Sequence, residues 1–310
     1  MKNKYNWVKF KYKCQEGFTS VIIPVYKDPE GIRDTLESLK KQTISKDKYE
    51  IIVTNDGADG ETASVCKEYN VNLINQTPNQ GSYVARNRAL EEARGEYIAF
   101  VDADIKVNED WLEKGVKSLQ KYDYVGGRIV VDRDKMNTII HYYQLYEGFD
   151  NNYLDRNHFN PTASLFVKRE VIEEIGAFDG RLESGGDLEF GDRVFVSGQY
   201  IQFFNEKLIV VHPPRNKLDK KILRTRYGIK KLIHMYPERF GYLTPSVLKS
   251  FIKIFFPPIK KVFCKNEELN LIIKIRVLFI YIWIRFITFV CIFNVFTLGR
   301  KYSTRGENNG

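Results

Sequence analysis

Two aspartates, Asp102 and Asp104, are separated by one residue and follow the apolar run 97–101. That run predicts a buried strand, and the polar stretch 108–110 beyond it predicts the start of a helix. Side chains two residues apart point to the same side of an extended segment, so both carboxylates can face one site. Hard divalent cations prefer such oxygen ligands. An isolated Asp-x-Asp is more often a pair of solvated acids in a loop, so the surrounding elements must decide.

The first two hundred residues alternate short apolar runs with helix-like segments. This alternation predicts a mostly parallel α/β sheet with helices on both faces. Ligands bind such sheets at the carboxyl ends of the strands. Asp56, the Asp102/Asp104 pair and Asp187 are all expected at strand ends or in loops. The expected strands are 20–26, 49–55, 71–75, 97–101, 124–131, 162–167, 200–204 and 208–211, and the expected helices are about 28–41, 60–69, 82–94, 137–149, 169–175 and 188–197.

Composition indicates a globular protein in a reducing compartment. The chain has 310 residues, 43% hydrophobic and 28% charged. Its four cysteines are scattered without metal-ligand spacing, which is typical of buried thiols in a reducing environment. The first residues lack the apolar core of a secretory signal. We therefore expect a cytoplasmic location.

The basic charge of the chain is confined to its C-terminal part. Residues 1–214 carry 28 Lys and Arg against 34 Asp and Glu, a net charge of −6, whereas residues 215–265 carry 14 against 2, a net charge of +12. The sequence changes character near Pro213-Pro214. Such a basic segment indicates an anionic partner, either membrane lipid or nucleic acid. No recognised nucleic-acid module accompanies it, so we expect a membrane surface and no nucleic acid.

An apolar segment, 277–298, follows the basic one. It is 22 residues long with Arg285 as its only charge. That length can cross a bilayer, but an arginine near the middle would be costly there. Lys274 and Arg285 lie three helical turns apart and share a face, which favours a helix in the membrane interface with these cations toward the headgroups. A single span and a buried amphipathic helix remain as alternatives.

Six motifs occur in an order that resembles one known family. They resemble family 2 inverting glycosyltransferases of the GT-A (nucleotide-diphospho-sugar transferase) fold, and the match covers about residues 19–212. The resemblance implies a catalytic domain 19–214 (nucleotide part 19–104, acceptor part 105–214). Residues 1–18 are expected to be an N-terminal extension, and residues 215–310, which lie outside the shared pattern, are expected from their charge and apolar content to form a basic helical extension. The motifs are 19–26, Val53-Thr54-Asn55-Asp56-Gly57, Ala85-Arg86-Asn87, 95–104, Ile175-Gly176-Ala177-Phe178-Asp179 and 184–190.

The resemblance implies a donor site at the strand ends. It implies a nucleotide-diphosphate sugar, with a UDP-sugar as first expectation, and Mn²⁺ or Mg²⁺ as cofactor. Asp104 would ligate the metal, and His212, directly after the strand 208–211, would complete the metal shell, although a lone histidine is more often structural. The nucleotide-sugar pocket would be lined by Pro24, Tyr26, Asp56, Arg86 and Asp102.

The resemblance also implies an acceptor site with a general base. Inversion needs a base on the face opposite the leaving group, and Asp187 matches the family's catalytic aspartate. The family usually has Glu before this aspartate, whereas Gly186 stands here, which puts one acceptor contact in doubt. Asp187 could alternatively cap the following helix. Glu189 and the aromatic residue Tyr146 are further acceptor candidates, although a core role for Tyr146 is favoured by its helical spacing.

These expectations describe an enzyme on the cytoplasmic side of a membrane. It would be a metal-dependent, inverting glycosyltransferase of hexosyltransferase type, acting on a glycan or lipid-linked acceptor in cell-surface polysaccharide synthesis. Its tail would hold it peripherally at the inner face of the cell membrane. One alternative is a sugar nucleotidyltransferase, but the glycine-rich, basic triphosphate loop expected after the first strand is absent at 26–29. The other is an inactive GT-A scaffold, which the intact Asp102, Asp104 and Asp187 disfavour.

Overall fold

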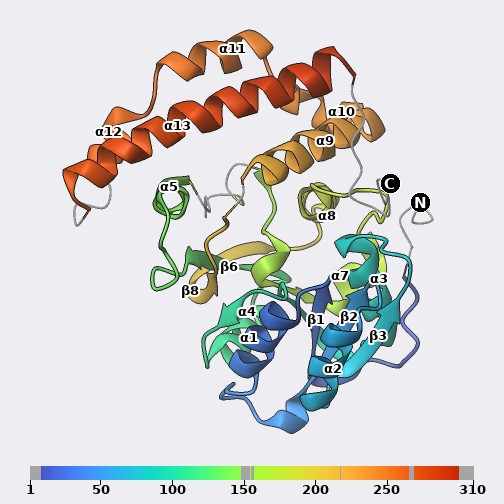
Figure 1. Cartoon of the computed structure of the whole chain (residues 1–310). Helices are drawn as coiled ribbons and strands as arrows, with labels where there is room; N and C mark the ends of the chain where they lie inside the picture. Colours follow the sequence, from blue (N-terminus) through green and yellow to red (C-terminus); the bar gives the residue numbers. More distant parts are fainter. Residues whose placement is uncertain (1–7, 148–153, 155–156, 217, 265–268, 300–310) are drawn as a thin grey trace. The chain divides into compact units, whose positions relative to one another are not determined.

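The strands at whose ends the candidate residues were expected all belong to one sheet (Figure 1). A computed structural model describes residues 8–147, 154, 157–216, 218–264 and 269–299. Within these residues the strand order is β3-β2-β1-β4-β7-β6-β8-β5. The strands are β1 (Gln15–Val25), β2 (Tyr49–Asp56), β3 (Asn72–Gln76), β4 (Gly95–Phe100), β5 (Lys106–Val107), β6 (Tyr124–Val131), β7 (Leu165–Lys168) and β8 (Gln202–His212).

The chain divides into two compact units. Among the described residues, the first contains those within 8–130 and 154–212, and the second contains those within 131–147 and 213–299. Segment 131–147, expected in the acceptor part of the catalytic domain, thus groups with the C-terminal residues, while the end of the expected helix 137–149 lies outside the described residues. The helices of the first unit are α1 (Pro29–Leu39), α2 (Gly60–Glu68), α3 (Ser82–Glu92), α4 (Trp111–Leu119), α7 (Arg169–Ile175) and α8 (Gly186–Ser197).

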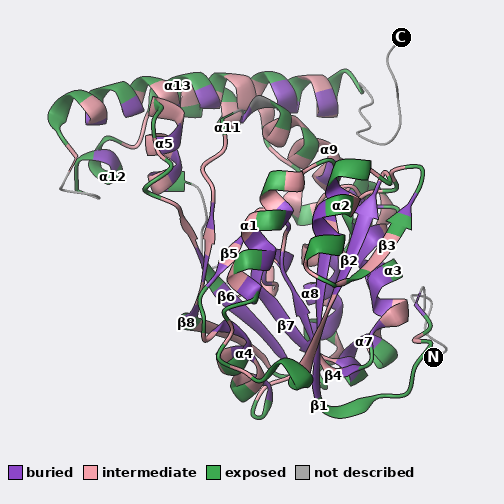
Figure 2. Ribbon diagram, turned by 60° about the horizontal axis from the view of Figure 1, so that its bottom comes forward, coloured by how far each residue is buried: buried purple, intermediate pink, exposed green. Residues whose placement is uncertain are grey.

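The first four strands along this sheet are parallel, as the alternation of strands and helices predicted. β1 pairs with β2 and with β4, and β2 pairs with β3, all in parallel. These strands are apolar because helices cover both faces, and Val21, Ile22 and Ile23 are fully buried (Figure 2). The start of helix α1 is determined by residues next to it in the sequence. Asp28 Oδ1 accepts from the N–H of Gly31 at 2.9 Å, and the helix begins at Pro29.

The second half of the sheet is antiparallel, which the sequence did not predict. β7 pairs antiparallel with β4 and β6, and β5 pairs antiparallel with β8. Two expected strands, 200–204 and 208–211, are one continuous strand, β8, and the first part of 162–167 is a short 3₁₀ turn at Thr162–Ser164. Apolar alternation locates strands but carries no information on their direction.

The second unit is helical. Its helices are α5 (Ile139–Glu147), α9 (Asp219–Met235), α10 (Pro237–Phe240), α11 (Val247–Ile252), α12 (Ile259–Cys264) and α13 (Leu271–Ile292). Helix α13 contacts α5, α9, α11 and α12. With the turn that follows it, α13 is long and apolar enough to cross a membrane by length and composition.

The side chains of Lys274 and Arg285 on α13 do not point where the sequence analysis expected. Lys274 Nζ donates to the carbonyl of Phe263 at 3.2 Å, and Arg285 Nη1 donates to the carbonyls of Lys253, at 2.7 Å, and Phe256. The expectation that both side chains extend toward headgroups is therefore wrong. Main-chain carbonyls left over at the ends of the preceding short helices are strong acceptors, and they bind these cations instead.

Candidate active site

The parallel strands bring several predicted donor-site residues to one edge. Val25 of β1 lies opposite Asn55 of β2, and the N–H of Val101 bonds the carbonyl of Ile22. Tyr26, Asp56 and Asp102 therefore leave adjacent strands at the same end of the sheet. Tyr26 is half exposed, and its ring lies against Gly57, where any side chain at residue 57 would collide with it. The half-buried Pro24 lies at the end of β1, two residues before Tyr26.

Asp56 organises the loop before α3. Its Oδ1 accepts from Gln76 Nε2 at 2.7 Å and from the N–H of Gln80 at 2.8 Å, and its Oδ2 accepts from the N–H of Gly81 at 2.8 Å. The carboxylate is almost fully buried. Charge-assisted bonds of this kind are strong, so Asp56 fixes the position at which α3 begins. Its predicted contact with a nucleotide base remains a prediction.

Arg86 joins two of the predicted residues. It extends from α3, is nearly buried, and its Nη2 donates to Asp102 Oδ1 at 2.5 Å. Its charge also lowers the pKa of Asp187, against the larger effect of burial. The guanidinium carbon lies 5.7 Å from the centre of the Tyr83 ring. Arg86 therefore holds Asp102 and lies over the ring of Tyr83, whose hydroxyl bonds Asp187 at the start of α8.

Asp104 and His212, the two predicted metal ligands, lie close together, and their role as metal ligands stays a prediction. Strands β5 and β8 pair with Lys106 opposite Val211, so the residues that flank this ladder adjoin. His212 Nε2 lies 3.6 Å from Asp104 Oδ2, with the histidine buried and the carboxylate partly exposed. One imidazole nitrogen and one carboxylate oxygen suit Mn²⁺, and phosphate oxygens of a donor can fill other positions. Among the described residues there is no cluster of three or more His, Cys, Asp or Glu that could hold a metal without such a ligand.

Asp187 lies in the first turn of α8. The N-cap of α8 is Gly185. The alternative in which Asp187 is the N-cap of this helix is therefore wrong. Its Oδ1 accepts from the N–H of Leu188 and from the hydroxyl of Tyr83, each at 3.1 Å. Burial raises the pKa of the Asp187 carboxyl, while Arg86 and Tyr83 partly oppose that rise. A carboxylate with a raised pKa is a better proton acceptor near neutral pH.

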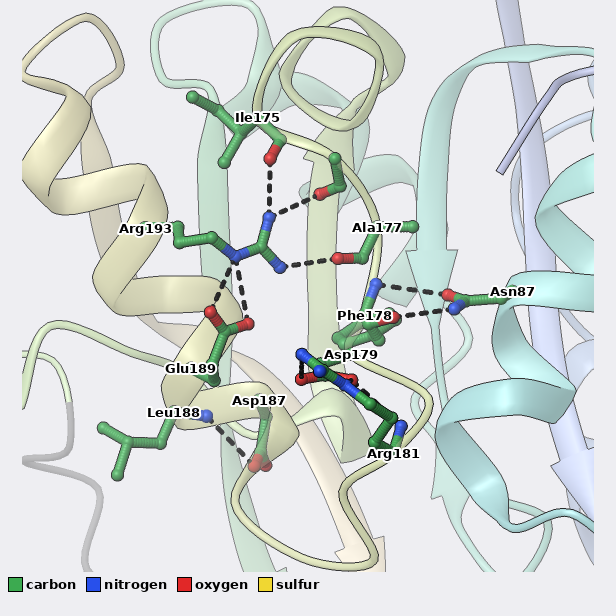
Figure 3. A network of polar contacts seen from close by, with 11 residues as sticks. Asn87, Ile175, Ala177, Phe178, Asp179, Arg181, Asp187, Leu188, Glu189 and Arg193 are labelled. Atoms are coloured by element: carbon green, nitrogen blue, oxygen red, sulfur yellow. Dashed lines mark hydrogen bonds and ion pairs between the residues drawn. The ribbon is translucent and has the colours of Figure 1, made fainter. Parts of the chain in front are cut away.

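Glu189 stands apart from the open site. It is fully buried, and both its oxygens accept from Arg193 Nε at 3.0 Å (Figure 3). Arg193 also donates to the carbonyls of Ile175, Gly176 and Ala177. This pair holds the loop before α8 and leaves Glu189 no access to an acceptor. The structure therefore does not support Glu189 as an acceptor-binding residue. It agrees instead with the alternative in which Glu189 stabilises the site from the core.

We expect Glu189→Ala to destabilise the fold without touching the reacting groups. The change leaves the Arg193 guanidinium as an uncompensated buried charge, which costs about 3–5 kcal/mol of unfolding free energy. Urea unfolding checks this. The exposed pair Arg88–Glu91 provides the matched control, since Glu91→Ala should cost less than about 1 kcal/mol. Equal losses from the two variants would contradict the assigned role.

Asn87 fastens the same loop to α3. Its Oδ1 accepts from the N–H of Phe178 at 3.1 Å, and its Nδ2 donates to the Phe178 carbonyl at 2.7 Å (Figure 3). The motif containing Arg86 and the motif containing Phe178 are therefore in direct contact. Sequence analysis quoted Asn87 in a motif without assigning it a role, and it missed Tyr83 and Arg193. No local signal identifies such contacts, because the partners of Asn87 and Tyr83 lie 91 and 104 residues away.

Tyr146 is a core residue of the second unit. It lies in a buried cluster with Val262, Val277 and Tyr281, and its hydroxyl donates to the Val262 carbonyl at 3.2 Å. The acceptor assignment for Tyr146 is therefore wrong, and the core role indicated by its helical spacing is confirmed. A ring buried in such a cluster presents no face on which a sugar could stack.

Known proteins resemble this chain in sequence and in fold. The model for "Glycosyl transferase family 2" matches residues 20–176. Glycosyltransferase AglE of Haloferax volcanii is 32% identical over 224 residues, which cover 68% of this chain and 72% of that protein. A poly(ribitol-phosphate) beta-glucosyltransferase of Bacillus spizizenii is 38% identical over 99 residues, covering 30% of this chain and 16% of that protein.

Two solved structures share the fold at low sequence identity. The mannosyltransferase PcManGT from Pyrobaculum calidifontis, in complex with GDP-Man and Mn²⁺, has a TM-score of 0.63 at 16% identity and covers 96% of this chain and 92% of its own. S. aureus TarS 1-349 in complex with UDP has a TM-score of 0.52 at 16% identity, with 92% and 93% covered. These neighbours show the GT-A fold. With half of the chain matched by the family model, the chain belongs to glycosyl transferase family 2.

Proposed function

We propose that this glycosyltransferase moves a sugar, with inversion, from a nucleoside-diphosphate donor to a hydroxyl of a glycan or lipid-linked acceptor. The observation that carries the proposal is the convergence of Asp104 with His212 at 3.6 Å, at the sheet edge where Asp102 binds Arg86. PcManGT holds GDP-Man with Mn²⁺ and TarS holds UDP, which supports a nucleotide-sugar donor but leaves its base open. Relatives named as a poly(ribitol-phosphate) beta-glucosyltransferase and as a putative teichuronic acid biosynthesis glycosyltransferase support a role in polysaccharide synthesis, which we propose to be that of a cell-surface glycan.

Donor binding is assigned to the strand-end residues. Asp104 and His212 would hold a Mn²⁺ or Mg²⁺ ion, and Asp102, oriented by Arg86, would accept from the ribose. When bound, the cation stabilises the negative charge that develops on the leaving diphosphate. Tyr26 is exposed beside Gly57 and offers a ring against which a nucleotide base can stack.

Proton removal is assigned to Asp187. The attacking hydroxyl loses its proton as the new bond to the anomeric carbon forms, and a carboxylate within hydrogen-bond distance accepts it. Asp187 has one oxygen, Oδ1, bound by Tyr83 and Leu188. Those two bonds orient the carboxylate, and each carboxylate oxygen has further lone pairs for an acceptor proton.

A screen of sugar nucleotides for thermal stabilisation tests donor binding. UDP-, GDP- and dTDP-sugars are added with and without MnCl₂, because a ligand that binds only the native state raises the melting temperature. We expect one nucleotide class to stabilise the protein and to do so more with the cation. No stabilisation by any sugar nucleotide, with or without cation, would contradict the proposal.

The second unit is assigned a membrane-docking role. From Phe279 onward the outer face of α13 is apolar and exposed, with Phe279 67%, Phe286 53% and Trp283 44% exposed, and the exposed Arg276 lies one turn before Phe279 on the same face. Because Lys274 and Arg285 bind carbonyls of the same unit, that face carries neither of these charges. A large exposed apolar patch beside a basic segment fits the interface of an anionic bilayer, with the apolar side chains among the acyl chains. This would keep the enzyme at the inner face of the membrane, near a lipid-linked acceptor.

Vesicle binding observed through Trp283 tests this docking. Trp111 is fully buried, so Trp283 is the described tryptophan that lipid can reach. Bromolipids in anionic vesicles should quench its fluorescence, and Trp283→Phe, which keeps the apolar surface, identifies the quenched signal. We expect Phe279→Asp to weaken flotation with the vesicles, whereas Tyr12→Asp, at another exposed aromatic residue, should not. Equal flotation of wild type and Phe279→Asp without quenching would overturn the docking surface.

A further inference from the structure

Tyr83 occupies the space beside Asp187 where a side chain of residue 186 would lie. A Cβ added to Gly186 would come within 2.7 Å of two carbons of the Tyr83 ring. The ring is held from its other side by Phe178, with centroids 5.7 Å apart and planes 26° apart. Tyr83 is itself almost fully buried. Glycine at 186 is therefore a condition for this ring position, and real Cβ atoms do not approach a packed ring so closely.

The ring position places the Tyr83 hydroxyl on the carboxylate of Asp187. The bond to Oδ1 is 3.1 Å long, and the Arg86 guanidinium lies over the same ring. Tyr83 and Arg86 are three residues apart on α3, so one face of this helix reaches both Asp187 and Asp102. Asn87 anchors that helix to the loop before Asp187.

We propose that Tyr83 is a positioning residue for Asp187, with Gly186 as the residue that makes room for it. The hydroxyl fixes the orientation of the carboxylate through its bond to Oδ1. This inference rests on the proposed role of Asp187 as base. It accounts for glycine at 186, where the family resemblance led us to expect glutamate.

The first test replaces Tyr83 by Phe. The variant keeps the ring against Phe178 and Gly186 and removes only the hydroxyl. Because a hydrogen bond to the ionised carboxylate favours ionisation, its loss raises the pKa of Asp187 further. We expect the acidic limb of the kcat/KM profile to move to higher pH and kcat at the pH optimum to fall about tenfold, with KM for the donor unchanged. Tyr49→Phe, which loses a bond to the Leu39 carbonyl, is the matched control.

The second test introduces a methyl group at residue 186. Gly186→Ala should displace the ring and reproduce the pH shift of Tyr83→Phe, whereas Gly60→Ala, where nothing lies within 4 Å of the new Cβ, should not. In the double variant Tyr83→Ala/Gly186→Ala the two effects should be less than additive, because the collision is gone. An unchanged pH profile in both Tyr83→Phe and Gly186→Ala would overturn the role of Tyr83. A fall of kcat by about 10²- to 10⁴-fold in Asp187→Asn together with such unchanged profiles would leave the proposed base intact, so the two failures are distinguishable.

Discussion

Replacing Asp187 by Asn is expected to lower kcat by about 10²- to 10⁴-fold, the contribution typical of a general base. Asn keeps an oxygen that can accept from Tyr83 and Leu188, so the geometry of the start of α8 is preserved. Donor binding, measured by thermal shift with Mn²⁺, should stay within about threefold of wild type. A variant that loses donor binding as well would show that Asp187 has a structural role instead.

The stability of the same variant provides a control with a definite sign. Burial raises the pKa of Asp187 above its unfolded value, so the protonated form is favoured in the native state. The contribution to stability is present below the unfolded pKa and is lost as pH rises through the folded pKa. At neutral pH Asn removes this unfavourable ionisation. The melting temperature of Asp187→Asn should therefore equal or exceed that of wild type, and a marked decrease would contradict the assigned burial effect.

Replacing Asp104 by Ala is expected to give the second large effect. A bound cation that neutralises a leaving diphosphate contributes several kcal/mol, and each 1.36 kcal/mol is tenfold in rate. We expect kcat/KM to fall by about 10²- to 10³-fold and the MnCl₂ concentration for half-maximal rate to rise. His212→Ala should shift the metal response in the same direction, because its Nε2 lies 3.6 Å from Asp104.

Initial rates measured over a range of MnCl₂ concentrations test this second prediction. Asp110→Ala is a matched control, since Asp110 is a partly exposed acid paired with Lys114 on the surface. That variant should respond to metal as wild type does. If Asp104→Ala also kept the wild-type metal response, the carboxylate would not belong to the metal shell.

The parallel part of the sheet follows from local sequence. The runs at 20–26, 49–55 and 97–101 are apolar and lie at spacings that leave room for crossover helices, and β1, β2 and β4 confirm them. Asp28 and Pro29 mark the start of α1 by capping chemistry alone. Such signals are local in the sequence, so they can be interpreted without knowledge of the fold.

Contacts between distant residues were beyond local signals. Nothing near Tyr83 indicates a partner 104 residues later. The Glu189–Arg193 pair has the i,i+4 spacing that sequence can identify, but its burial and the bonds of Arg193 to the carbonyls at 175–177 depend on the loop that packs against it. The direction of β7 is decided by its neighbours, β4 and β6, which apolar periodicity does not identify. The same limit explains the error at α13, where Arg285 bonds carbonyls about thirty residues earlier instead of headgroups.

The configuration of the product tests the central claim most directly. Once the screen has identified a donor, a short incubation with acceptor gives a product whose anomeric carbon is assigned by NMR from its coupling constants. A single displacement assisted by Asp187 as base predicts the configuration opposite to that of the donor sugar. Retention of the donor configuration in the first-formed product would contradict it.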